Sequence, residues 1–341
     1  MKNTVKQAQE KMEGFTHEFP NDLLDSMQVA EKHPINLKKE MLSNIVLCGM
    51  GGSGIGGMLA REILFDQQTI PVEYWKGYIL PNYVNHKSLV VCSSYSGNTE
   101  ETLALYDQAK SKNAQIIVIC SGGKLHQKAE QDGVLCLKIQ GGKQPRAAVG
   151  LSLVQQIHIL GSLFLNEDEK TQLHSEIKTI AKDLIEGKNN FHETGKTIAQ
   201  QLINKSVTLY TETAYASIAT RFMQQMNENV KKKAHVAIVP EMNHNELVAF
   251  VDFTKKDAVI VVNSNCFNAQ NSKRIEFMIH QLENQDATVI VVNQDKQLSK
   301  VRNFLFTIYT LDLATIELAK ALGVDSEEVY VIEGLKKKIA Q

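Results

Sequence analysis

The chain has 341 residues, of which 22% are charged, and its 37 Lys and Arg nearly balance its 38 Asp and Glu. This composition predicts a soluble protein of about two domains, without the positive field that attracts nucleic acid or anionic lipid. We find neither a signal-peptide core nor an apolar run of about 20 residues, so we expect a cytoplasmic protein that enters no membrane.

The predicted elements begin with a helical lead-in of 43 residues, in which Leu23, Leu24, Met27 and Ala30 have helical spacing. Short apolar strands then alternate with helices. Strands are predicted over 44–47, 88–92, 116–120 and 134–137, and helices over 55–65 and 99–110. Such alternation with continuous apolar strands favours a parallel sheet that helices cover on both faces.

A helical pattern starts at about residue 147 and continues to about residue 204, after which the strand rhythm resumes. Strands are predicted over 207–210, 235–239, 258–262 and 288–292. The stretch Leu89-Val-Val-Cys-Ser-Ser, with the helix and strand that follow it, is echoed weakly from Ala258 onward. We therefore predict an α/β fold of two tandem doubly wound domains, 1–150 and 151–341, each a mostly parallel sheet flanked by helices.

A glycine-rich turn follows the first predicted strand and opens a helix. Residues 49–57 contain six glycines, which permit tight turning and close approach of the backbone to a ligand, and the helix N-terminus attracts anions. Gly49, Gly51 and Gly54 also satisfy the GxGxxG pattern of dinucleotide-binding folds. However, Glu73 lies inside the next apolar stretch, whereas the ribose-binding acid belongs at a strand end. A dinucleotide site and a purely structural turn are therefore the alternatives to a phosphate site.

A second polar loop, residues 93–101, also follows a strand and opens a helix. Ser94, Ser96 and Thr99 offer hydroxyl donors, and each hydrogen bond to a charged group contributes about 1.5–3 kcal/mol. Ser and Thr are also ordinary helix caps, which is the alternative for this loop. Two such loops at the carboxyl ends of neighbouring strands favour a phosphate site, because open α/β sheets bind ligands there.

The five cysteines predict reduced thiols that serve as small hydrophobic residues, because most lie in or beside apolar runs and none forms a CxxC pair. They are Cys48, Cys92, Cys120, Cys136 and Cys266. The ten histidines are scattered and no HExxH motif is present. We therefore expect no metal ion and no cofactor in the reaction, and activity that survives EDTA.

The sequence resembles the bifunctional phosphoglucose/phosphomannose isomerases of the sugar isomerase (SIS) domain superfamily. The serine loop is shared by the whole superfamily, whereas the Asn-Glu-Asn and Asn-His-Asn-Glu segments are more specific to this family. The residues that carry the resemblance lie in order along most of the chain: Gly49-Met-Gly-Gly-Ser-Gly, Ser94-Tyr-Ser-Gly-Asn-Thr-Glu-Glu, Pro145-Arg146, Asn227-Glu-Asn-Val-Lys231 and Pro240-Glu-Met-Asn-His-Asn-Glu246.

The resemblance implies two SIS-type domains and an aldose–ketose isomerase. It would interconvert glucose 6-phosphate and mannose 6-phosphate with fructose 6-phosphate through a cis-enediol. Glu228 would move the proton between C1 and C2, and Arg146 would stabilise the enediolate. His244 would assist ring opening from the partner subunit of a homodimer, and Lys336 would reach the sugar. The substrate, mainly its phosphate, would be held by Gly52, Ser53, Ser94, Ser96 and Thr99.

Taken alone, these residues have plainer interpretations. Glu228 could be a solvated carboxylate beside the lysines at 231–233, and Arg146 a structural ion-pair partner. His244 could be a loop histidine bonded to a neighbouring asparagine, with Glu241 and Glu246 flanking it. Lys336 could be a solvated residue that complements a helix dipole.

One departure from the family pattern concerns residues 323–328, Gly-Val-Asp-Ser-Glu-Glu, where the family commonly has Asp-Pro. The departure bears on the balance between glucose and mannose epimers and not on the proposed base. Two alternative functions stay open. One is a non-catalytic sugar-phosphate-binding SIS protein, for which a DNA-binding module is not expected, and the other is an NAD-dependent dehydrogenase.

Overall fold

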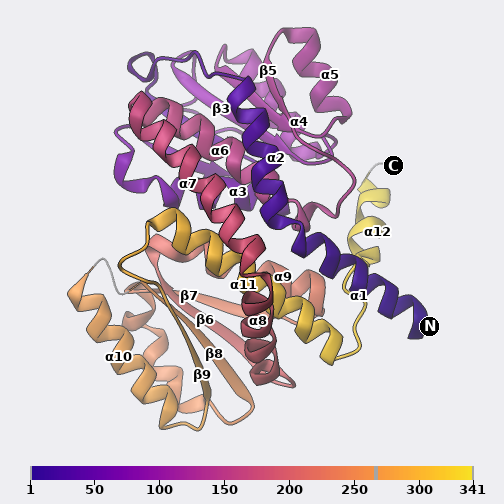
Figure 1. Cartoon of the computed structure of the whole chain (residues 1–341). Helices are drawn as coiled ribbons and strands as arrows, with labels where there is room; N and C mark the ends of the chain where they lie inside the picture. Colours follow the sequence, from indigo (N-terminus) through magenta and orange to yellow (C-terminus); the bar gives the residue numbers. More distant parts are fainter. Residues whose placement is uncertain (1, 265–267, 340–341) are drawn as a thin grey trace. The chain divides into compact units, whose positions relative to one another are not determined.

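The computed structural model describes residues 2–264 and 268–339, and the chain forms two compact units with one parallel sheet in each (Figure 1). The first unit comprises residues 18–186 and 300–304. The second unit comprises residues 1–17, 187–299 and 305–341.

The sheet of the first unit has five parallel strands in the order β2-β1-β3-β4-β5. These strands are β1 (Asn44–Cys48), β2 (Val72–Trp75), β3 (Ser88–Ser94), β4 (Gln115–Cys120) and β5 (Leu135–Lys138). The four strands predicted in this part of the chain are confirmed. Every residue of β1 and β3 is buried, as expected for central parallel strands with helices on both faces.

Helices cover both faces of this sheet (Figure 1). On one face α4 (Glu100–Ser111) and α5 (Gly123–Asp132) pack over a core cluster that includes Val90 and Cys120. On the other, α3 (Gly51–Ile63) packs on α6 (Val149–Phe164). A Cβ on Gly56 would lie 2.8 Å from Ser152 Oγ, and one on Gly57 would lie 2.7 Å from Gln156 Oε1. Glycine therefore allows the close contact between these two helices.

The units divide the chain after residue 186, not after residue 150 as the sequence predicted. The reason is that α6 and α7 (Glu167–Glu186) pack against α2 (Phe19–Lys32), so they complete the first unit. The helical lead-in is also divided. Its first helix, α1 (Lys2–His17), belongs to the second unit, whereas α2 belongs to the first.

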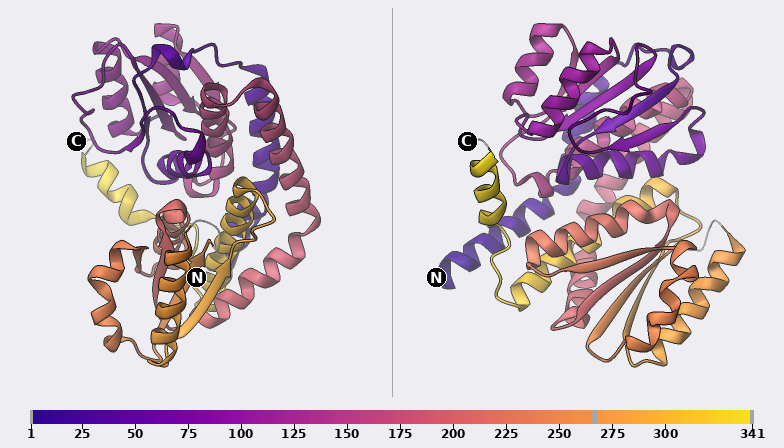
Figure 2. Two further views of the ribbon diagram at one scale, coloured as in Figure 1. Left: turned by 90° about the vertical axis from the view of Figure 1, so that its left-hand side faces the viewer. Right: turned by 180° about the vertical axis from the view of Figure 1, so that it is seen from behind.

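The second unit repeats the topology of the first with four parallel strands in the order β7-β6-β8-β9 (Figure 2). They are β6 (Ser206–Glu212), β7 (Ala234–Val239), β8 (Asp257–Asn263) and β9 (Thr288–Asn293). All four predicted strands are confirmed. In both sheets the second strand in chain order lies at the edge next to the first, and the third and fourth strands follow on the other side. The echo between 89 and 258 thus joins equivalent strands, β3 and β8.

The helices that complete the second unit are α1, α8 (Lys188–Leu202), α9 (Ala216–Gln225), α10 (Ala269–Glu283), most of α11 (Lys300–Ala321) and α12 (Tyr330–Ile339). The helix α10 covers a core cluster that contains Tyr210, Val261 and Met278. In α8, Gly195 allows close contact with α11, because a Cβ there would lie 3.0 Å from the backbone nitrogen of Ala314. Among the described residues, no helix has the length and apolar character needed to cross a membrane.

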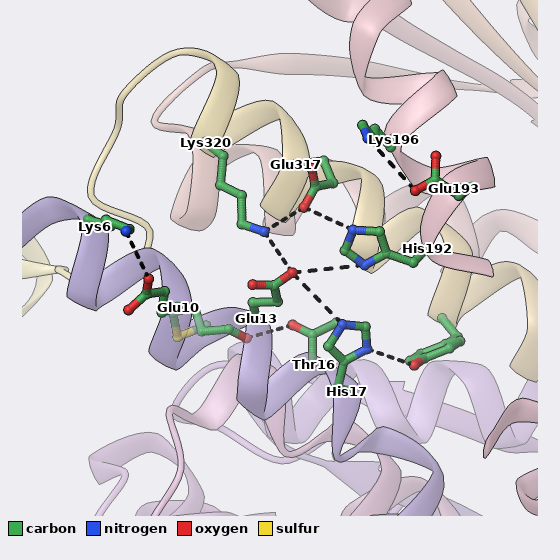
Figure 3. Close-up of polar contacts among 12 residues, drawn as sticks. Lys6, Glu10, Glu13, Thr16, His17, His192, Glu193, Lys196, Glu317 and Lys320 are labelled. Atoms are coloured by element: carbon green, nitrogen blue, oxygen red, sulfur yellow. Dashed lines mark hydrogen bonds and ion pairs between the residues drawn. The ribbon is translucent and has the colours of Figure 1, made fainter. Parts of the chain in front are cut away.

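A polar cluster joins α1 to α8 and α11 (Figure 3). The ammonium of Lys320 lies 2.6 Å from the Glu13 carboxylate and 2.7 Å from that of Glu317. The imidazole of His192 lies 3.4 Å from Glu317, and its ring stacks on that of His17. Burial is the main cause that lowers the pKa of His17 to about 4. The cluster therefore ties the N-terminal helix into the second unit.

Candidate active site

The glycine-rich turn lies against the segment that carries Arg146. The helix α3 begins at Gly51, and its N-cap, Met50, supplies no side-chain cap. A Cβ on Gly52 would lie 2.5 Å from the carbonyl oxygen of Pro145 and 3.0 Å from Cα of Arg146. Only glycine fits this contact, so the sequence lets the first turn of α3 meet the short helical turn Pro145–Ala147. The Arg146 side chain is buried, with 3% of its surface exposed.

The glycine turn and the serine loop are joined directly. The hydroxyl of Ser53 accepts a hydrogen bond of 2.7 Å from the backbone N–H of Tyr95. A Cβ on Gly49 would lie 2.9 Å from the carbonyl oxygen of Ser93. The two loops follow β1 and β3, which pair in parallel, so they lie next to each other at the carboxyl edge of the sheet. The predicted neighbourhood of these loops is therefore confirmed.

The side chains of the serine loop hold one another. Ser94 Oγ lies 2.8 Å from Thr99 Oγ1 and accepts a 3.1 Å hydrogen bond from the N–H of Gly97. Thr99 occupies the N-cap position of α4, but its side chain makes no capping hydrogen bond. The bond between the two hydroxyls uses one of their two hydrogens, so the other can be donated to an anion. Ser96 is exposed, and its Oγ accepts a 3.2 Å hydrogen bond from the N–H of Asn98.

Glu228 lies in a turn of π-helix, Met226–Val230, that directly follows α9. Such single turns are frequent at functional sites. The next residue, Asn229, is fully buried and donates a 3.0 Å hydrogen bond from Nδ2 to Thr315 Oγ1 in α11. The turn ends at Lys231 in the left-handed conformation, with φ of 58°. A buried side-chain contact thus fixes the backbone that presents Glu228.

The Glu228 side chain is partly buried and lines a cavity of about 640 Å³ in the second unit. Lys231 Nζ donates to two backbone oxygens of residues that line this cavity, those of Glu228 at 2.6 Å and Glu328 at 2.7 Å. The volume lies in the range of pockets that hold small molecules. The residues that line the cavity are Asn227, Glu228, Lys231, Lys232, Lys233, Glu328, Val329, Tyr330, Val331 and Ile332.

His244 and Lys336 are both exposed, and neither lines this cavity. His244 ends a short helical turn, Glu241–His244, that follows β7, and Lys336 lies in α12. Glu246, which flanks His244 in the sequence, makes its contacts with other residues. It accepts a 2.6 Å hydrogen bond from the Tyr210 hydroxyl and lies 3.1 Å from His235.

The asparagines beside His244 also have other partners. The Asn243 side chain lies 3.1 Å from the sulfurs of Met242 and Met278. Asn245 Nδ2 lies 3.4 Å from the carbonyl oxygen of Glu241. The two asparagine amides therefore contact Met242, Met278 and Glu241, and not His244 as in the plainer interpretation of that histidine.

The corresponding edge of the second sheet has a different chemical character. Glu212 ends β6 and is buried, and the hydroxyl of Ser264, just after β8, donates a hydrogen bond to its carboxylate. Burial raises the pKa of Glu212. A carboxylate at this edge repels a nearby phosphate, in contrast to the neutral hydroxyl groups of the serine loop in the first unit.

Sequence reasoning missed the groups that hold these residues in place. The Tyr95 N–H that fixes Ser53 is a backbone group, so no residue type signals it. Asn229 belongs to the Asn-Glu-Asn segment, and its partner Thr315 lies 86 positions away along the chain. The only indication of its role in the sequence is that a polar residue stands between Glu228 and the apolar Val230.

Two parallel sheets of one topology, with glycine and serine loops at the ligand-binding edge of the first, define a protein of two SIS domains. Family comparison agrees: residues 41–165 match the SIS domain, and residues 191–339 match the bacterial phospho-glucose isomerase C-terminal SIS domain. The chain belongs to the bifunctional phosphoglucose/phosphomannose isomerase family. It is 32% identical to the enzyme of that name from Caldicellulosiruptor bescii, over 95% of this chain and 98% of the relative.

Two further proteins are similar to the chain at lower sequence identity. A D-glucosamine-6-phosphate 4-epimerase from Sulfolobus acidocaldarius is 28% identical over 86% of this chain and 88% of the relative. The C-terminal domain of glucosamine-fructose-6-phosphate aminotransferase from Francisella tularensis has a TM-score of 0.73 at 18% identity, covering 91% of this chain and 95% of that one. The structural likeness establishes the fold alone.

Proposed function

We propose that the chain is an aldose–ketose isomerase that interconverts fructose 6-phosphate with glucose 6-phosphate and with mannose 6-phosphate. The observation that carries this proposal is the 32% identity over almost the full length of an enzyme named for both reactions. The two linked loops of the first unit support it, because they offer amide and hydroxyl donors of the kind that hold a phosphate.

In this proposal the phosphate is held by Gly52, Ser53, Ser94, Ser96 and Thr99. The first turn of α3 supplies N–H groups and the positive end of a helix dipole. The Ser94 and Thr99 pair supplies an O–H donor. Because these donors are neutral, the site binds the anion without a lysine, and the donors cost less to desolvate than charged groups would.

Glu228 is the base that carries a proton between C1 and C2 of the open-chain sugar. One carboxylate can serve both carbons through a cis-enediol, because the two carbons are adjacent on one face of the intermediate. The fixed backbone of the π-turn supports this role, since a base must be held within hydrogen-bonding reach of the proton that it removes.

Three other residues complete the proposal. The planar guanidinium of Arg146 stabilises the negative oxygen of the enediolate, and Lys336 contacts the sugar. The exposed His244 assists ring opening from the partner subunit of a homodimer. We infer a cytoplasmic enzyme that acts on a hexose 6-phosphate and needs no cofactor.

The test is to incubate the pure protein with fructose 6-phosphate and separate the products. Formation of both aldose phosphates supports the dual function, and glucose 6-phosphate alone reduces the proposal to one activity. Binding without turnover would identify a sugar-phosphate-binding protein and contradict the proposal.

A second substrate belongs in the same test because one relative is an epimerase of glucosamine 6-phosphate. The protein should leave glucosamine 6-phosphate unchanged while it isomerises fructose 6-phosphate. Conversion of the amino sugar in preference to the ketose would assign this chain to the epimerase reaction instead.

A further inference from the structure

A group of three potential metal ligands lies in the first unit, away from the loops described above. Cys120 ends β4, His126 lies in α5, and Cys136 lies in β5, so a single strand-helix-strand crossover supplies all three. The two sulfurs and a ring nitrogen lie within 4.8 Å of one another. The sulfur atoms themselves are 3.6 Å apart.

The histidine of this group is oriented as metal-bound histidines usually are. Its Nε2 faces the carboxylate of Glu130, at 3.5 Å from Oε1. Its Nδ1 is buried and has no hydrogen-bond partner. A carboxylate on one ring nitrogen commonly fixes the tautomer that leaves the other nitrogen as ligand. A buried nitrogen lone pair without a partner is costly, and a bound cation would satisfy it.

The spacing of the sulfurs agrees with thiolate coordination. A zinc–sulfur distance of about 2.3 Å and a tetrahedral angle place two thiolates about 3.8 Å apart. The observed separation of 3.6 Å is close to this value.

We propose that Cys120, His126 and Cys136 bind a Zn²⁺ ion, with Cys120 Sγ, Cys136 Sγ and His126 Nδ1 as ligands. Two thiolates and one neutral imidazole are the donors that zinc prefers, and they cancel its charge. Cys136 and His126 are only partly buried, so water can supply the fourth ligand. Glu130 lies on the far side of the ring and orients it.

Two comparable groups in the chain lack this combination. Cys48 and Cys92 lie opposite each other in β1 and β3, but the metal-ligand groups found among the described residues do not include them. The cluster of Glu13, His17 and His192 already has a cation beside it, because the Lys320 ammonium pairs with Glu13 (Figure 3). Zinc there would have to displace a lysine, whereas the ion pair of His126 is with the carboxylate of Glu130.

The proposed zinc site is connected to the serine loop through the segment between its first two ligands. The N–H of Ser121 donates a 3.0 Å hydrogen bond to the Tyr95 carbonyl, and the N–H of Leu125 donates one of 2.9 Å to the Gly97 carbonyl. Ser121 adjoins the ligand Cys120, and Leu125 adjoins the ligand His126. A bound zinc ion would therefore restrain the backbone segment that supports the serine loop. The ion would act on structure and would not take part in the proposed proton transfer.

The test uses the full chain, fully reduced and stripped of metal, titrated with Zn²⁺ against a chromogenic chelator. We expect one tight site per chain and a rise in the melting temperature with Zn²⁺. Co²⁺ should bind in the same place and give a thiolate-to-metal charge-transfer band. His126→Gln should weaken Zn²⁺ binding at least tenfold, and Cys136→Ser should also reduce the cobalt band.

Two controls separate this site from the others. Cys92→Ala removes a buried cysteine that is not one of the three ligands, and His192→Gln removes the histidine of the other cluster, so both should bind Zn²⁺ as the parent does. The proposal is overturned if the parent binds no Zn²⁺, or if His126→Gln binds it with unchanged affinity. Because His126 is partly exposed, its variant should fold even if Cys136→Ser does not.

Discussion

A Cβ on Gly52 would lie 2.5 Å from the carbonyl oxygen of Pro145, which is closer than any real Cβ contact. This single contact joins the helix start that supplies amide donors to the turn that carries Arg146. Because the atom it would meet belongs to the backbone, no side-chain movement can relieve the clash.

We predict that Gly52→Ala destabilises the protein by about 1–3 kcal/mol, as overpacking usually does, and raises KM for fructose 6-phosphate. Denaturant unfolding and steady-state kinetics measure the two effects. Gly14→Ala is the matched control, because a Cβ at Gly14 in α1 meets nothing within 4 Å. That change should stabilise the protein by up to about 1 kcal/mol. If Gly52→Ala and Gly14→Ala change stability and KM equally, the close contact between Gly52 and Pro145 does not have the proposed role.

The Ser94 hydroxyl should contribute to phosphate binding. Ser94→Ala removes both the bond to Thr99 and the acceptor for the Gly97 N–H. Loss of one hydrogen bond to a charged group corresponds to about 1.5–3 kcal/mol, so KM should rise about 10- to 150-fold. Ser93→Ala is the control, since the Ser93 hydroxyl is buried without a hydrogen-bond partner and its loss should leave KM nearly unchanged. A larger effect at Ser93 would place the phosphate elsewhere.

Glu228→Gln should lower kcat by about 10²–10⁴-fold, the usual contribution of a general base, while KM changes little. Glu328→Gln tests whether any acid of the same cavity matters, because both residues line it. We expect near-normal turnover from the second variant. Exchange of solvent deuterium into C1 or C2 of the sugar gives an independent measurement. A Glu228→Gln enzyme that still exchanges at the parent rate would remove this residue from the mechanism.

Stability should fall as the pH drops from about 6.5 toward about 4, in part because of His17. Its pKa is lowered to about 4 in the fold, mainly by burial, so the unfolded chain binds the proton first. The neutral side chain therefore stabilises the fold above pH 6.5, and this contribution is lost on acidification. His17→Gln should flatten the dependence of unfolding free energy on pH in that range by up to about 1.4 kcal/mol per pH unit.

Thermal or urea unfolding at several pH values measures this slope. The exposed His86→Gln variant controls for the loss of one histidine without burial. If the His17→Gln variant has the same slope as the parent, another group causes the loss of stability at acidic pH.

The fold could be predicted closely because its signals are local. Most strands contain a short apolar run, although β2, with Glu73 inside it, is not among those predicted. The two loops carry residues whose chemistry is visible in the chain, such as Gly52 and Ser94. The division into units could not be predicted, since α6 and α7 join the first unit through packing on α2 and not through any boundary signal.

The surroundings of the candidate site residues were also beyond local reasoning. Glu246 is close to His244 in sequence, yet its carboxylate is taken by Tyr210 and His235, which come from two strands of the sheet. Likewise the bond from Asn229 to Thr315 requires α11 to lie beside the π-turn. Contacts between distant segments decide which of two neighbouring polar residues is free for chemistry.

Glycines of the turn are required at two different places along α3, its first turn and its middle. Gly52 is required where the helix meets Pro145, whereas Gly56 and Gly57 are required where it crosses α6. The length of such a run therefore reflects how crowded the whole helix is. A homologue could lose the distal glycines by repacking its helices and keep its anion site, so the number of glycines is a poor measure of ligand affinity.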